Sequence, residues 1–232
     1  MNTFTSSLTA AFSLLAGMDA LLLDVVLRSL AVSASACAIA SVFGLLLGAW
    51  LGVSRFKGRG AVLALLNTAL ALPSVVVGLV VYLLLSRSGP LGFLGWLFSF
   101  NAMVLAQSVL VLPVVMALVR QTIEDADRGH GEQFASLGAS PFARSLILLW
   151  DERFALLTVL LAAFGRAISE VGAVMIVGGN IDGFTRVMTT SIALETSKGD
   201  LPMALALGMV LLGVVLMLNM LIGLVKQWVV KK

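Results

Sequence analysis

The stretch Glu124–Pro141, with the sequence EDADRGHGEQFASLGASP, is the longest polar interval in a chain that is otherwise strongly apolar. Within it, Phe134 and Leu137 stand three residues apart, which places them on one face of a helix. Apolar side chains on one face of a solvated segment favour docking of a partner protein. A segment packed against its own domain is the other interpretation.

The second half of this interval carries signals for a turn between two helices. Gly138 fits the residue after a helix C-terminus, where a left-handed backbone is common. Ser140 is a typical N-cap, and Pro141 suits the first turn of the helix that follows. The interval is therefore predicted to form a helix, a short turn and a second helix.

The composition around this interval places the chain in a membrane. Of the 232 residues, 60% are hydrophobic and 12% charged, and the mean hydropathy is +1.08. A soluble domain carries about 25% charged residues, because its surface must be wetted. The chain is therefore predicted to be an all-α polytopic membrane protein. Short alternating strands, which a membrane barrel needs, are absent from the sequence.

Five intervals are long enough to span a bilayer, which takes about 20 apolar residues. The predicted spans are residues 25–53, 61–86, 101–119, 154–177 and 202–229. The first contains a run of small residues, 33–41, that suits close helix packing. Pro73 and Pro113 should kink the second and third spans. Such kinks serve either a water-filled path or simple packing.

The basic residues predict the orientation of these spans. Ten of the 15 Lys and Arg fall on one side and four on the other, and the richer side should be cytoplasmic. The N-terminus is then outside, the C-terminus is cytoplasmic, and residues 120–151 form a cytoplasmic coupling loop. The net charge of +3 is explained by Lys and Arg in the short loops, where they set the orientation of the spans, so no nucleic-acid partner is expected. Trp50, Trp150 and Trp228 fall near the cytoplasmic interface, and Trp96 near the outer one.

Residues 1–24 are expected to lie outside the transmembrane domain, which takes up residues 25–232. They are only mildly apolar and too short to span, so they are interpreted as an amphipathic segment on the membrane surface or as a frayed tail. They lack a basic region before the first apolar stretch, so a cleaved signal peptide is not expected.

The chain lacks the residues that hydrolytic catalysis and metal binding need. His130 is the single histidine and Cys37 the single cysteine, and no phosphate-binding GxxxxGK[ST] motif is present. We expect no catalytic residue, no metal site, no cofactor bound by this chain and no enzymatic activity of the chain alone.

The polar interval resembles a known motif. Glu132-Gln133-Phe134-Ala135-x-x-Gly138 is similar to the EAA loop of ABC importer permeases, in which a coupling helix sits in a cleft of the ATPase subunit. Gln133 and Phe134 replace the two alanines, and the later proline of that family is missing opposite Asp151. The resemblance implies an ATPase-coupling surface made by Glu132, Phe134, Ala135, Leu137, Gly138, Ala139 and Pro141.

The fourth predicted span narrows the resemblance. The segment from Gly165 to Ile181, GRAISEVGAVMIVGGNI, resembles the molybdate, tungstate and sulfate permeases, and is most like the tungstate branch. The resemblance implies a type I importer permease fold with a translocation path or gate near Pro73, Ser74, Arg166, Glu170, Gly172 and Asn180.

Arg166 and Glu170 stand four residues apart inside this predicted span, so they should share one helix face. An unpaired arginine at this depth costs about 2.5–3.5 kcal/mol or more, so the pair should face the bundle or a wet cavity. Two interpretations remain: the pair lines an anion path, or it joins helices as a structural link.

Taken together, the resemblance implies the transmembrane subunit of an ATP-driven oxyanion importer in the cytoplasmic (inner) membrane. Tungstate is favoured, and molybdate or sulfate is possible. The expected partners are a second copy of the chain, two cytoplasmic ATPase subunits that use the ATP, an extracytoplasmic oxyanion-binding protein and the lipid bilayer. The alternatives are a secondary transporter or channel that works alone, and a structural membrane scaffold.

Overall fold

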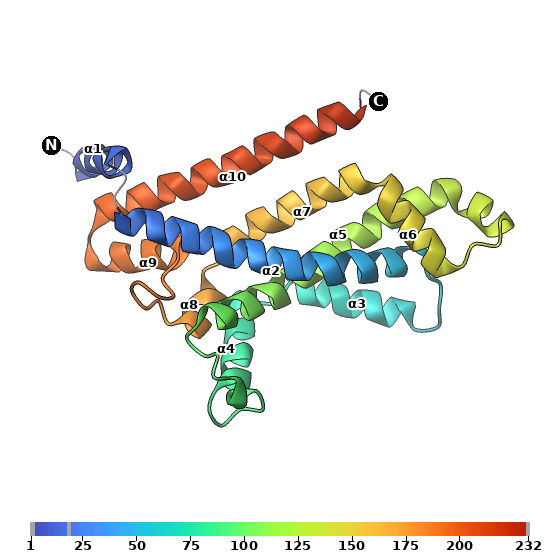
Figure 1. Ribbon diagram of the computed structural model, residues 1–232, viewed down its shortest axis with the longest axis horizontal. Helices are drawn as coiled ribbons and strands as arrows, with labels where there is room; N and C mark the ends of the chain where they lie inside the picture. Colours follow the sequence, from blue (N-terminus) through green and yellow to red (C-terminus); the bar gives the residue numbers. More distant parts are fainter. Residues whose placement is uncertain (1–2, 18–19, 231–232) are drawn as a thin grey trace. The chain divides into compact units, whose positions relative to one another are not determined.

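The computed structural model describes residues 3–17 and 20–230, and these ranges are helical nearly throughout (Figure 1). The all-α prediction is confirmed for them. The elements in chain order are α1 (Thr3–Ala16), α2 (Ala20–Val53), α3 (Arg59–Leu70), α4 (Ser74–Leu85), the short 3-10 helix η1 (Gly92–Leu94), α5 (Phe100–Ser136), α6 (Pro141–Asp151), α7 (Arg153–Ile168), α8 (Gly172–Gly178), α9 (Met188–Lys198) and α10 (Leu201–Val230).

Three helical segments are long and apolar enough to cross a membrane, namely Ala20–Val53, Phe100–Gly129 and Leu201–Leu224. The pairs α3–α4 and α7–α8 are each interrupted by a short break, and each pair could supply one further span. The structure therefore supports three to five spans. The count of five spans and the N-terminus-outside orientation stay predictions.

The helix boundaries differ from the sequence prediction in two places. Helix α2 begins at Ala20 instead of residue 25, and α5 continues to Ser136 instead of ending near residue 119. Pro113 lies inside α5 without ending it. The extension of α5 is supported by ion pairs one helical turn apart, because Glu124 pairs with Arg120 at 2.6 Å and with Arg128 at 3.6 Å. The predicted coupling loop is thus mostly helix.

Two predicted spans are broken. The kink expected at Pro73 is a full interruption between Leu70 and Ser74. The fourth predicted span, residues 154–177, is interrupted, because α7 ends at Ile168 and α8 begins at Gly172, so Arg166 and Glu170 do not share one helix as predicted. Helix α9 was not predicted at all, since its Thr, Ser and Glu residues resemble a loop in composition.

The chain divides into two compact units. Unit 1 comprises Met1–Ser35, Pro73–Gln107 and Arg166–Met217, and unit 2 comprises Ala36–Leu72, Ser108–Gly165 and Leu218–Lys232. The chain passes between the units within α2, α5, α7 and α10, and at the break between α3 and α4. Each predicted span thus has one part in unit 1 and one part in unit 2.

In unit 2, α2 packs closely on α5 through three glycines spaced four residues apart. A Cβ atom at Gly44 would lie 2.6 Å from Val115 Cγ1, and one at Gly48 would lie 2.8 Å from the carbonyl oxygen of Met116. At Gly52 it would lie 3.0 Å from the carbonyl oxygen of Arg120. Small residues at this spacing let membrane helices approach closely. These glycines lie beyond the run 33–41 for which close packing was predicted.

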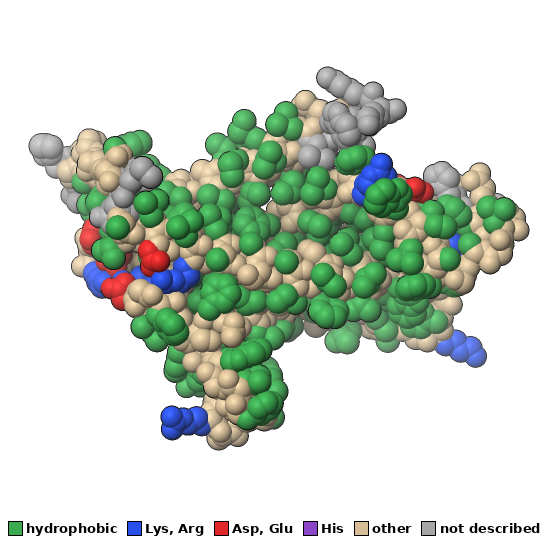
Figure 2. Space-filling model, viewed as in Figure 1, with side chains coloured by type: hydrophobic (Ala, Val, Ile, Leu, Met, Phe, Trp, Pro, Cys, Tyr) green, Lys and Arg blue, Asp and Glu red, His purple; other side chains and the backbone are tan. Residues whose placement is uncertain are grey.

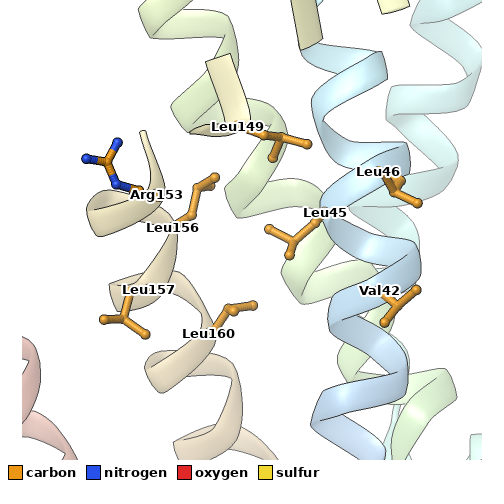
Figure 3. A pocket seen from close by; sticks show the side chains of 8 residues that line it. All are labelled: Val42, Leu45, Leu46, Leu149, Arg153, Leu156, Leu157 and Leu160. Atoms are coloured by element: carbon orange, nitrogen blue, oxygen red, sulfur yellow. The ribbon is translucent and has the colours of Figure 1, made fainter. Parts of the chain in front are cut away.

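Much of the surface is apolar, as a bilayer requires. Figure 2 shows hydrophobic side chains over most of the visible face, with charged ones confined to a few places. Unit 2 also has an open groove of about 440 Å³, lined by residues of α2, α6 and α7 (Figure 3). Its lining is Val42, Leu45, Leu46, Leu149, Arg153, Leu156, Leu157 and Leu160.

The packing of α2 on α5 predicts that Gly48→Ala destabilises the protein. The added methyl group meets backbone, which cannot move aside as a flexible side chain can, and overpacking of this kind costs about 1–3 kcal/mol. The measurement is the midpoint of thermal unfolding in detergent. Gly213→Ala in α10 is the matched control, because a Cβ there has open space. It should be neutral or stabilising, and equal midpoints for the two variants would contradict the close approach.

Candidate functional site

The C-terminus of α5 closes with local hydrogen bonds that need a glycine. Gly138 has a φ of 70°, in the left-handed region, as predicted. The N–H of Ala139 donates to the carbonyl oxygen of Phe134 at 3.0 Å, and that of Leu137 to Gln133 at 3.2 Å. This is a Schellman-type helix end, which satisfies carbonyls that the helix leaves open.

The second helix of this region, α6, begins as the sequence predicts. Ser140 is its N-cap and accepts a hydrogen bond from the N–H of Ala143 at 3.2 Å, and Pro141 stands in the first turn. Arg144 of α6 forms an ion pair with Asp127 of α5. Gly131 leaves room for that guanidinium, since a Cβ there would lie 2.9 Å from Arg144 Nη2. The turn and the ion pair join α5 and α6 into one ordered corner, which we call the elbow (residues 127–150).

The elbow exposes large apolar side chains. Leu137 is 81% exposed and Trp150 71%, and Phe142 is exposed as well. Phe142 and Trp150 were missed from the sequence, although their spacing with Leu146 at every fourth residue is a signal for one helix face. Pro141 is exposed, whereas Phe134 and Ala139 are only partly so. The side chains of Glu132 and Ala135, two further predicted coupling residues, lie outside those the structure describes.

A second candidate site lies in unit 1, where the helices that follow the two breaks pack against each other. A Cβ at Gly78 of α4 would lie 2.7 Å from Ala173 Cα in α8. One at Gly172 would lie 2.8 Å from Ser74 Oγ. Only glycine allows the backbones to come this close, so the first turns of α4 and α8 meet. We call Ser74, Arg166, Glu170 and Gly172 the break junction.

The carboxylate of Glu170 connects the parts of the break junction. Its Oε2 accepts from Arg166 Nη1 at 2.9 Å, and its Oε1 accepts from the backbone N–H groups of Val171 and Ala173 at 3.1 and 3.4 Å. The Ser74 hydroxyl hydrogen-bonds to the same side chain. Thr189 of α9 donates to the Glu170 carbonyl oxygen at 2.6 Å. Glu170 is 5% exposed and lies beyond the end of α7, so it caps α8 rather than sharing a continuous helix with Arg166.

Arg166 differs from Glu170 in its exposure, since 51% of its side chain is accessible. A guanidinium carries five N–H donors, and the contact with Glu170 uses the nitrogen Nη1 alone. The two residues therefore differ in their surroundings. The Glu170 carboxylate is buried among hydrogen-bond donors at the break, whereas the Arg166 guanidinium is half-exposed.

Polar groups continue into the interior of unit 1 behind the break junction. Gln107 Nε2 donates to the carbonyl oxygen of Ala167 at 3.0 Å, near the end of α7. A small cavity of about 10 Å³ adjoins Gln107, Ser29, Ser33 and Glu170. A cavity of this size and polarity matches a single water molecule, which would extend the hydrogen bonds around the break.

The remaining predicted path residues lie outside the break junction. Pro73 precedes α4 with a φ of −63° and is exposed. Asn180 follows α8 in a left-handed conformation, with a φ of 50°, and its Nδ2 donates to the carbonyl oxygen of Thr190 in α9 at 3.4 Å. Among the described residues, no group of three or more His, Cys, Asp or Glu side chains could hold a metal ion.

Comparison with known proteins gives a consistent assignment. Residues 44–231 match the family described as binding-protein-dependent transport system inner membrane component. A probable anion ABC transporter permease protein of Haloferax volcanii is 40% identical over 203 residues, which cover 85% of this chain and 88% of that protein. The tungstate uptake system permease protein TupB of Peptoclostridium acidaminophilum is 40% identical over 219 residues, covering 94% and 96%.

More distant relatives transport another oxyanion. The sulfate transport system permease protein CysT of Escherichia coli is 31% identical over 186 residues, which cover 76% of this chain and 66% of that protein. The matched residues include both the elbow and the break junction. The chain belongs to the binding-protein-dependent transport system inner membrane component family, and is thus an ABC transporter permease, a multi-pass protein of the inner membrane.

Proposed function

We propose that the chain is the membrane subunit of an ATP-driven importer of an oxyanion, with tungstate as the cargo. It works as a homodimer with the path at the dimer interface, two ATPase subunits on the cytoplasmic side and a binding protein outside. The tungstate and anion permeases that are 40% identical over most of this chain support the cargo. ATP is bound and hydrolysed by the partner subunits.

The exposed apolar elbow is the observation that carries this proposal. Leu137 and Trp150 would each bury a large apolar area in a partner's cleft, and burial of a side chain of this kind contributes about 1.5–3 kcal/mol. The Arg144–Asp127 ion pair holds α6 to α5, so a push on the elbow passes into the membrane helices instead of bending a loop. ATP binding closes the ATPase pair, moves the elbows and switches the path between inward and outward access.

Arg166 is the residue we assign to the anion path. A tetrahedral dianion needs donors that are not already consumed, and the half-exposed guanidinium offers them. The carboxylate of Glu170 would repel a dianion if it were open, but four donors already surround it. A transporter or channel that works alone, the other function considered, would leave the exposed elbow without a purpose and does not fit the family assignment.

The coupling role predicts that Leu137→Glu abolishes ATPase binding. The charge would have to be buried in an apolar contact, which costs several kcal/mol. The measurement is co-purification of the ATPase with tagged permease from mild detergent. Gln121→Glu on the exposed side of α5 adds the same charge outside the elbow and should bind normally. Wild-type recovery of the ATPase with Leu137→Glu would rule out the elbow as the coupling surface.

Substitutions of Arg166 and Glu170, the two charged residues of the break junction, should differ in their effects on transport and on stability. Arg166→Gln removes a charged donor that is half-exposed, so tungstate uptake by the full complex should fall by about tenfold or more. The Glu170 carboxylate keeps its three other hydrogen-bond donors, so the loss of stability should be smaller than for Glu170→Gln. Glu170→Gln weakens the cap of the break and leaves Arg166 without its carboxylate, so unfolding should be easier by about 1–3 kcal/mol. A purely structural link would show the opposite for Arg166→Gln, with lost stability and intact uptake.

Cargo is tested with the permease, its ATPase and its binding protein expressed together in cells that lack oxyanion uptake. Accumulated tungsten should exceed accumulated molybdenum at equal external concentrations, and excess sulfate should not compete. Cells with the Leu137→Glu variant, which should not bind the ATPase, give the background accumulation to subtract. Equal uptake of sulfate and tungstate would refute the tungstate assignment while leaving the importer mechanism standing.

A further inference from the structure

Four arginines of unit 2 converge on one carboxylate, that of Glu124 in α5. Arg120 and Arg59 approach Glu124 Oε2 at 2.6 and 3.1 Å. Arg55 and Arg128 approach Glu124 Oε1 at 3.7 and 3.6 Å. We call these four residues the arginine cluster.

The inner and outer members of the arginine cluster are bonded differently. Arg59 and Arg120 are largely buried, and their distances to Glu124 are those of charge-assisted hydrogen bonds. The side chains of Arg55 and Arg128 are 57% and 71% exposed. Their distances to Glu124 exceed hydrogen-bonding range, so most of their donors remain available. Glu124 is thus already neutralised by the inner pair.

The surroundings leave the outer pair with excess positive charge. Asp125 lies 3.5 Å from Arg128, which offsets part of that residue's charge. Lys57 is exposed in the turn between α2 and α3 and adds another cation. The four arginines thus lie within reach of only two carboxylates, Glu124 and Asp125, which leaves a net positive charge. A concentration of like charge on one surface is stabilised when an anion binds there.

An aromatic pair stands beside the cluster. Trp50 near the end of α2 stacks on Phe56 of the following turn, with ring centroids 5.3 Å apart, and both are partly exposed. Arg59 bonds the carbonyl oxygen of Leu51, which ties the turn to the end of α2. Aromatic side chains beside basic ones are typical of the headgroup level of a membrane, where the rings contact lipid and the cations contact phosphate.

We propose that Arg55 and Arg128 bind the phosphate of an anionic glycerophospholipid, with Trp50 and Phe56 against its glycerol and upper acyl region. Guanidinium groups match phosphate geometry with paired N–H donors, and basic surfaces beside membrane helices on the cytoplasmic side bind anionic headgroups. A free tetrahedral anion shares the phosphate chemistry, but it gives no reason for the aromatic pair. The lipid therefore fits the whole surface, whatever oxyanion the transporter carries.

The test titrates phosphatidylglycerol into the purified full-length protein in a neutral detergent, with bound lipid counted by native mass spectrometry. Each arginine removed should weaken binding by about fivefold, so Arg55→Gln with Arg128→Gln should weaken it by about 25-fold. Both side chains are exposed and their contacts with Glu124 are long, so the variant should lose less than about 1 kcal/mol of stability. Arg153→Gln is the matched control, because Arg153 is also exposed and lies over the Trp150 ring at 5.0 Å, and its affinity should stay within about twofold of wild type.

Three results would overturn the proposal. They are unchanged lipid binding in the double variant, equal retention of phosphatidylcholine, and displacement of the lipid by inorganic phosphate or tungstate at comparable concentrations. The third would assign the arginine cluster to a free anion. The lipid titration contains neither ATPase nor cargo, so its failure is distinct from a failure of the importer assignment.

Discussion

The carboxylate of Glu170 is the interaction on which unit 1 depends. Inside a bilayer no water is available to satisfy backbone groups that a broken helix leaves open, so each must find a partner in the protein. Glu170 accepts from the N–H groups of Val171 and Ala173, and it draws Arg166 and Ser74 to the same point. The N–H groups exposed by the break after Ile168 thereby have hydrogen-bond partners, and α4 and α8 can pack as closely as Gly78 and Gly172 allow.

Unit 2 uses charge for a different purpose. At Glu124 a single carboxylate orders two inner arginines and leaves two outer ones directed to their surroundings. At Asp127 a single ion pair with Arg144 fixes the angle of the elbow. Both arrangements stand at the polar end of α5, where the helix leaves its apolar stretch. Ion pairs thus stabilise the polar end of this long helix, beyond its apolar stretch.

Local chemistry decided which features could be predicted from the sequence. The helix end at Gly138 and the cap at Ser140 depend on residues within one turn, and both are confirmed. A kink was predicted at both Pro73 and Pro113, because proline removes a backbone donor. The helix is interrupted at Pro73, whereas α5 continues through Pro113. The break after Ile168 was not foreseen, because Glu170 was interpreted as a partner of Arg166 on one helix face and not as a cap for the N–H groups of Val171 and Ala173. The break junction also needs Ser74, which lies far from Glu170 in the chain, and no local pattern reports that contact.

The exposed elbow has a consequence for the life of the protein in the cell. Under the proposed function, Leu137, Phe142 and Trp150 are exposed to water whenever a copy has no ATPase bound. Surfaces of this kind are what chaperones and proteases recognise on incomplete assemblies. Surplus copies would therefore be short-lived, and the number of permeases in the membrane would follow the supply of their partner. The side chains that we propose to contact the ATPase would then also report whether the complex is complete.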